Sequence, residues 1–169
     1  MKLKFVKLSI VLIGCSVLSG CSGANFFDVQ SAMNVPKLSE TQEAVKKCVM
    51  EYMNSDLIWK YTWFENRYAA LIKCELGEDT SPIYVACCQA PEESKRVHIL
   101  FVNKLENKWK VVYDSIHFTD EVDNLVLEDV DNDGVKEIII HNKNFENAAN
   151  AVRCYKVEKN IIKEIKSIN

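Results

Sequence analysis

Hydrophobic and polar positions change their period once along the chain, shortly after residue 53. Residues 39 to 53 carry apolar side chains at helical spacing, with polar residues between them. Ser39 and Gln42 have the spacing of a capping box, which marks the start of a helix. The apolar face consists of Val45, Cys48, Val49, Tyr52 and Met53. The segment therefore predicts one amphipathic helix that packs on the core.

Downstream, the chain consists mainly of short runs rich in β-branched and aromatic residues, separated by polar turns. These runs are "RYAALIKC", "PIYVACCQ", "RVHILFVNK", "KWKVVYDSI", "NLVLED", "KEIIIHN", "AVRCYKV" and "IIKEIKSI". The segments "LENKW" and "VEKNI" are typical of tight hairpin turns. We therefore expect a mainly β domain of the α+β class, with one N-terminal helix and an antiparallel meander of strands.

A weak internal repeat runs through the predicted strands. Residues 71–86 align without a gap on residues 125–140, at an offset of 54 positions. Further on, "ILFVNKLENKWKVV" matches "AVRCYKVEKNIIKEI" with a slip of one residue. The unit is a strand, an acidic loop, a strand and a hairpin, and it occurs twice, over about 66–117 and 121–169.

The first twenty residues have the features of a secretory signal. Three lysines and no acidic residue precede the short apolar run "LSIVLIGCSVL", which is too short to span a bilayer. The segment ends in Leu18–Cys21, "LSGC", which resembles the bacterial lipobox. An ordinary signal peptide with a chance cysteine is the alternative.

The lipobox resemblance implies that Cys21 is acylated, by chains such as palmitate, and becomes the first residue of the mature protein. The predicted organisation is then a signal peptide over 1–20, a lipidated tether over 21–37 and a single domain over 38–169. Several acyl chains anchor a protein stably to a membrane. We therefore expect a protein that is anchored in the cell membrane and faces outside the cytoplasm.

Charge narrows the range of partners. Removal of the signal leaves 18 basic and 24 acidic residues, a net charge of −6. A mildly acidic surface argues against nucleic acids and anionic lipid headgroups as partners. Five cysteines remain after Cys15 and Cys21, and none has the C-x-x-C spacing of a zinc site. They suit the role of small buried hydrophobic residues, with one disulfide as the alternative.

The most informative segment is the acidic loop within "LEDVDNDGVKEIII". Counted from Asp129, side-chain oxygens stand at positions 1, 3 and 5, a glycine at 6 and a glutamate at 9. Calcium takes six to eight oxygen ligands, and alternating acidic residues in a tight loop can surround it. The predicted ligands are the side chains of Asp129, Asp131, Asp133 and Glu137 and the backbone carbonyl of Val135. The alternative is an Asp-Gly turn whose acidic groups are only solvated.

The loop differs from an EF-hand because Ile140 stands at position 12, where that motif has a bidentate glutamate. A weak structural calcium site, in the range of about 10⁻⁴ to 10⁻³ M, is therefore expected. The earlier copy has Glu75, Gly77, Asp79, Thr80 and Ile83 at the matching positions. It should keep the bend and lose the metal.

The segment "DVDNDGVKEIII" resembles FG-GAP/VCBS-type repeats, whose loops hold calcium in β-propeller blades. The wider order of "ENRYAALIKCELGED", "ENKWKVVYDS" and the second loop resembles small clostridial surface lipoproteins that carry such repeats. This resemblance implies a calcium-binding cell-surface lipoprotein and brings no catalytic residues. Two blade-like repeats cannot close a propeller, which needs about four or more.

Other candidate chemistry is sparse. Trp59, Tyr61 and Trp63 stand at i, i+2 and i+4, so they could form an aromatic strip that binds carbohydrate or peptide. Core packing is the alternative. The sequence contains no H-E-x-x-H, G-x-S-x-G, phosphate loop or dinucleotide fingerprint.

These features favour a non-catalytic binding or structural module with an extracellular or envelope partner. An accessory subunit or chaperone of an exported enzyme is the second hypothesis. A hydrolase is the third.

Overall fold

The computed structural model describes residues 38–54, 56–78, 80–93, 95–119, 121–143 and 150–168. The predicted signal peptide, Cys21 and the tether over 21–37 lie outside these residues. So does Asp79 of the first acidic loop. No helix among the described residues has the length and hydrophobicity needed to cross a membrane.

Helix α3 (Glu40–Met53) confirms the predicted amphipathic helix. Ser39 and Gln42 form both halves of the capping box, because each side chain bonds the backbone N–H of the other residue. Asn54 ends the helix in the left-handed region with φ 49°, and its N–H donates to the Met50 carbonyl. Val45 and Val49 on the inner face are fully buried.

The strands among the described residues form two sheets, of five and six strands. In the first sheet, β5, β6 and β7 pair in order, while β1 and β4 both pair with β5 at different positions along it. All of its pairs are antiparallel. The members are β1 (Ile58–Trp59), β4 (Leu71–Cys74), β5 (Ile83–Gln89), β6 (Arg96–Leu105) and β7 (Lys108–Phe118).

The second sheet has the order β11-β10-β9-β8-β2-β3. Its pairs are antiparallel except for β2 and β8, which run parallel where Trp63 lies opposite Asn124. The members are β2 (Thr62–Phe64), β3 (Arg67–Ala69), β8 (Glu121–Glu128), β9 (Glu137–Lys143), β10 (Asn150–Glu158) and β11 (Ile161–Ile168). The parallel pair departs from the predicted antiparallel meander, because β2 joins a sheet whose other main strands come much later in the chain.

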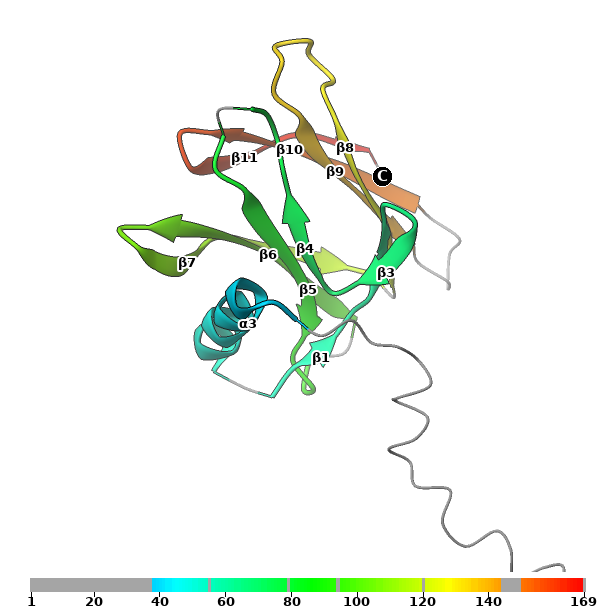
Figure 1. Cartoon of the computed structure of the whole chain (residues 1–169). Helices are drawn as coiled ribbons and strands as arrows, with labels where there is room; N and C mark the ends of the chain where they lie inside the picture. The colour runs from blue at the N-terminus through cyan, green and yellow to red at the C-terminus, as the bar shows by residue number, and fades with distance from the viewer. Residues whose placement is uncertain are drawn as a thin grey trace, which may run out of the picture. The chain divides into compact units, whose positions relative to one another are not determined.

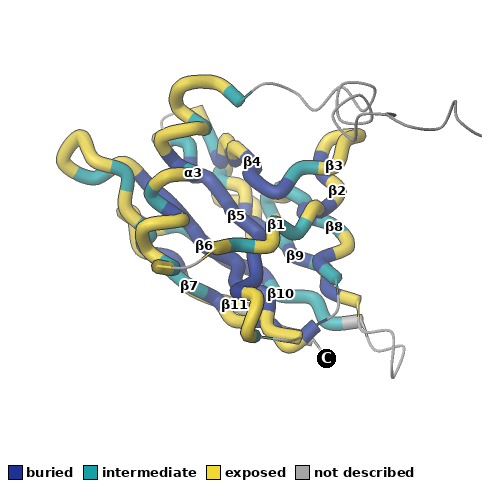
Figure 2. The backbone as a smooth tube through the Cα atoms, turned by 90° about the horizontal axis from the view of Figure 1, so that it is seen from below, coloured by how far each residue is buried: buried dark blue, intermediate teal, exposed yellow. Residues whose placement is uncertain are grey.

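The main core lies between the two sheets. Alternate residues of β5 face opposite ways, as strand geometry requires. Ile83, Val85 and Cys87 join the cluster that also contains residues of β8, β9 and β10. Tyr84, Ala86 and Cys88 instead join the cluster under α3. The domain therefore has three layers, with α3 against the first sheet and the second sheet on its other face (Figures 1 and 2).

The expectation of a mainly β fold with one N-terminal helix and no closed propeller is confirmed for the described residues. Four strands that are consecutive in the chain pair antiparallel within each sheet: β4 to β7 in the first sheet and β8 to β11 in the second. The predicted turns of "LENKW" and "VEKNI" close the β6–β7 and β10–β11 hairpins. Both central residues of each turn have positive φ: Glu106 and Asn107 in one, Lys159 and Asn160 in the other.

Candidate metal centre

The acidic loop joins β8 to β9 and projects beyond the ends of both strands (Figure 1). Glu137 is the first residue of β9 and is fully buried, whereas Asp131 and Asp133 are exposed. Carboxylate oxygens of Asp129, Asp131 and Glu137 lie within 4.8 Å of one another. The structure thus brings together three of the predicted ligands.

Backbone amides hold the loop in its tight turn. Asp133 N–H and Gly134 N–H donate to the two oxygens of Asp129, over 3.1 and 2.9 Å. Val135 N–H donates to Asp133 Oδ1 over 2.8 Å. Gly134 has φ 85°, a left-handed conformation that glycine adopts without strain. These bonds organise the side chains of Asp129, Asp131 and Asp133 around one turn.

Glu137 is the buried part of the candidate site. Its Oε2 accepts the N–H of Val130 over 2.9 Å, which fixes the orientation of the carboxylate. Its Oε1 is inaccessible to solvent and has no hydrogen-bond partner. A buried carboxylate oxygen without a donor is costly, so it favours a cation nearby.

A side chain that the sequence analysis did not single out supplies such a charge. Lys156, on β10, places its ammonium against Asp131 Oδ2 and 2.6 Å from Asp133 Oδ2. The same ammonium lies 3.6 Å from Glu137 Oε1. The hydrogen bonds that Lys156 donates to Asp131 and Asp133 raise the pKa of Lys156, and the bond from Lys156 is the main reason that the pKa of Asp133 falls.

The residues present fit a calcium ion. Three converging carboxylates, a fourth acid at Asp133 and the carbonyl of Val135 are all hard oxygen donors, as calcium prefers. The converging group contains no cysteine or histidine. Each carboxylate oxygen that accepts an amide still has a second lone pair for a metal.

The first acidic loop supports the second one. The Leu76 carbonyl accepts the N–H of Lys136 over 2.7 Å, and a Cβ on Gly77 would lie 3.5 Å from the Gly134 carbonyl oxygen. Glu75 in this loop pairs with Lys73 over 2.6 Å. Among the described residues of this loop no group of three acids converges. It therefore provides a bend on which the second loop packs.

The three aromatic residues of the predicted strip do not share one strand. Trp59 lies in β1 of the first sheet and packs on the cluster under α3. Trp63 lies in β2 of the second sheet, and Tyr61 is exposed between the two. The expectation of one common face is wrong because the chain passes from one sheet to the other at residues 60 and 61.

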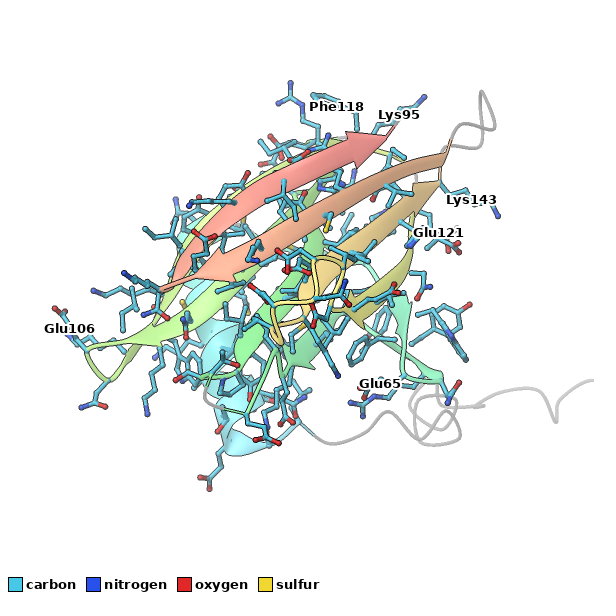
Figure 3. All side chains as sticks on the ribbon, turned by 90° about the horizontal axis from the view of Figure 1, so that it is seen from above. Glu65, Lys95, Glu106, Phe118, Glu121 and Lys143 are labelled. Atoms are coloured by element: carbon cyan, nitrogen blue, oxygen red, sulfur yellow. The ribbon has the colours of Figure 1, made fainter. Side chains whose placement is uncertain are left out.

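Trp63 has a different setting from the one expected. Its ring contacts Tyr68 edge-on, with the ring centres 5.0 Å apart. Together with Arg67, Lys73 and Lys136 it lines a cleft of about 590 Å³ beside β8. Glu65, at the β2–β3 turn, lines the same cleft and is labelled in Figure 3.

His98 is held between two carboxylates on the side of the first sheet that faces α3. Its Nε2 lies 2.7 Å from Glu93 Oε2, and its Nδ1 lies 3.0 Å from Asp114. Burial alone would lower the pKa of His98, but its hydrogen bonds to the carboxylates of Glu93 and Asp114, and the charges of those two groups, raise the pKa overall. These three side chains link β6, β7 and the turn before β6 that carries Glu93.

His117 lies in a buried polar network between the sheets. Its Nε2 is 3.0 Å from Ser115 Oγ and 2.9 Å from the Tyr155 hydroxyl. Its Nδ1 is 2.6 Å from Asn142 Nδ2. Ser115 and His117 are only 4% and 1% exposed, so a substrate could not reach this serine–histidine pair. Burial lowers the pKa of His117 to about 4.

The described thiols Cys48, Cys74, Cys87 and Cys88 form no disulfides. Burial raises the pKa of Cys88 to about 12 and also raises that of Cys74 and Cys87. These side chains act as small apolar residues of the core, as expected from the sequence.

Comparison of the chain with models of protein families, with curated proteins and with solved structures found no match.

Proposed function

We propose that the protein is a lipid-anchored, non-catalytic module that faces outside the cytoplasm and holds a structural calcium ion in its β8–β9 loop. The observation that carries the calcium assignment is the convergence of Asp129 and Asp131 on the fully buried Glu137. The ion would tie the tip of the hairpin to the base of β9. The lipobox-like "LSGC" supports the anchor.

The order of strands supports a module made of two blade-like repeats. β5 and β9 begin 54 residues apart, at 83 and 137, and β6 and β10 are also 54 apart, at 96 and 150. The two sheets also face the same way: the face of the first sheet that packs on α3 corresponds to the face of the second sheet that packs on the first sheet. Tyr84 and Ala86 face α3, and the residues 54 positions later, Ile138 and Ile140, face the first sheet. Successive blades stack in this way, each with one face on its neighbour's opposite face.

The cleft beside Trp63 supports a binding role. It combines an aromatic face with the cationic side chains of Arg67, Lys73 and Lys136, while Glu65 and Glu75 provide acidic groups. Mixed aromatic and charged linings suit an extended peptide or a carbohydrate. The partner that we propose is therefore an extracellular or envelope component.

Calcium should raise the melting temperature of the protein, and the substitution Asp131→Ala should abolish that effect. At ten times the dissociation constant, one bound ion adds about 1.4 kcal/mol to the free energy of unfolding. The measurement is a thermal melt in calcium, magnesium or chelator. Asp123→Ala, at an exposed position of β8 outside the loop, is the matched control and should keep the full response. No shift in the parent protein at 10 mM calcium would reduce the loop to a turn.

The anchor is tested separately. Cys21→Ser should leave the protein without acyl chains, because the thiol is the acceptor in this type of signal. The variant should move from the membrane fraction to the soluble or secreted fraction, and mass spectrometry should show the loss of the lipid. Unchanged membrane retention with no change of mass would contradict the lipobox assignment.

A further inference from the structure

We infer that Lys156 occupies the cation position of the acidic loop, so that calcium binds only when the lysine withdraws. This inference rests on the proposed calcium site and concerns its regulation. It assigns Lys156 as a tethered competitor, held in place by the fold, that keeps the loop closed without metal and sets a low calcium affinity.

The position of Lys156 follows from strand register. Tyr155 lies opposite Ile138 at the end of the β9–β10 pairing, so Lys156 stands beside the start of β9, where Glu137 enters the loop. Tyr155 faces the inter-sheet core, so its neighbour points to the other face. The lysine side chain then reaches the loop with only 14% of its surface exposed. Both the fold and the burial hold it there.

The ammonium and a calcium ion would need the same oxygens. Lys156 Nζ contacts Asp131 and Asp133 and lies 3.6 Å from Glu137 Oε1. Two of these acids, Asp131 and Glu137, belong to the converging group of three. The 2.6 Å from Nζ to Asp133 Oδ2 is close to the roughly 2.3–2.6 Å at which calcium binds oxygen. Two cations cannot share that volume.

Glu137 supplies the second reason for competition. Its Oε1 is buried without a hydrogen-bond donor, and the only cation within 4.0 Å of it among the described residues is Lys156. The distance of 3.6 Å is longer than a hydrogen bond, so the ammonium neutralises this oxygen only in part. A divalent ion in contact with Oε1 would do so more completely. The loop therefore holds its lysine and still favours a metal.

The need to displace Lys156 before calcium can bind lowers the apparent calcium affinity. When the competent state is only a fraction of the molecules, the apparent dissociation constant is raised by the reciprocal of that fraction. If the lysine is withdrawn in a tenth of the molecules or fewer, its removal should tighten binding about tenfold or more. Met fits the test because it keeps most of the apolar stem and lacks the charge.

The test is calorimetric titration of the full chain and of Lys156→Met with calcium chloride, together with melts in chelator. We expect the variant to bind calcium at least about tenfold more tightly and to melt at a lower temperature than the parent in chelator. Lys163→Met is the matched control, because Lys163 lies directly opposite Lys156 on β11 but pairs with Glu158. Its calcium affinity should stay within about threefold of the parent.

The outcomes separate the two proposals. Equal calcium affinity of the parent and Lys156→Met would overturn the competition and leave the calcium site standing. No calcium binding by either protein would overturn both. If Lys156→Met does not fold, amine labelling of the parent read by mass spectrometry replaces it. Calcium should then speed the labelling of Lys156 but not of Lys163, and an unchanged Lys156 rate with calcium bound would refute the competition.

Discussion

Glu137→Ala should lower the free energy of unfolding by roughly 3 kcal/mol in the presence of chelator. Glu137 is the only acidic side chain among the fully buried residues that the structure describes. Its removal leaves the Val130 amide without an acceptor and takes away one of the acids that face Lys156. It also leaves a cavity at the start of β9.

A matched control lies directly across the strand pair. Glu128 is the register partner of Glu137, in β8, and its side chain is exposed. Glu128→Ala removes the same number of atoms and the same charge from the same hairpin, so its cost should be below about 0.5 kcal/mol. Chemical denaturation in chelator measures both variants. Equal small costs for the two would mean that the buried carboxylate does not stabilise the loop.

Much of the fold could be predicted because its signals are local. The capping pair of Ser39 and Gln42 and the apolar spacing of the helix act over a few residues, and both appear in α3. The hairpin turns at 106–107 and 159–160 depend on two residues each. In β5 the sequence does not alternate between apolar and polar residues, so its pattern does not show which face is inside. All seven residues are buried, on one side by α3 and on the other by the second sheet.

The division of strands between the sheets could not be predicted in the same way. β1 and β2 are only two and three residues long, so they carry little periodicity of their own. Their sheet is decided by distant partners, Cys88 for Trp59 and Asn124 for Trp63. A sequence pattern over i, i+2 and i+4 assumes one continuous strand, and that assumption fails here.

The candidate metal site was predicted from its loop but not from its neighbours. The acidic residues are close in sequence, so their spacing alone suggests a cation. Lys156 is 25 positions from Asp131, and a lysine in a strand is ordinarily a solvent-facing residue. The available signal was the predicted meander, which places β10 next to β9. The contact between His98 and Asp114 could not be predicted from local spacing either, since Asp114 is 16 positions away on the next strand.

The protein should lose stability as the pH falls from 6.5 towards 4, and His117 should account for a large part of the loss. The native pKa of His117 is about 4, compared with an ordinary value of 6.5. Below pH 6.5 the unfolded chain therefore takes up a proton that the native protein excludes, which favours unfolding. The full contribution of His117 is present above pH 6.5 and is lost progressively as the pH approaches 4.

The expected size follows from the difference of about 2.5 between the two pKa values, at about 1.4 kcal/mol per pKa unit, which gives roughly 3.5 kcal/mol in total. Roughly 1.5 kcal/mol of it should be lost between pH 6.5 and 5, before most carboxylates titrate. Denaturant titrations at several pH values measure this slope. His117→Gln, whether or not it is less stable overall, should show a much flatter slope in that window. An unchanged slope would exclude His117 as its source.

His98 should act in the opposite direction and in a different window. Its pKa is raised in the native protein, because Glu93 and Asp114 outweigh the effect of burial. The stability that its protonation contributes is therefore complete below pH 6.5 and is lost as the pH rises through the higher native pKa. His98→Gln should flatten the alkaline side of the profile and leave the slope between pH 6.5 and 5 unchanged. Because the two histidines act on opposite sides of pH 6.5, each variant is a control for the other.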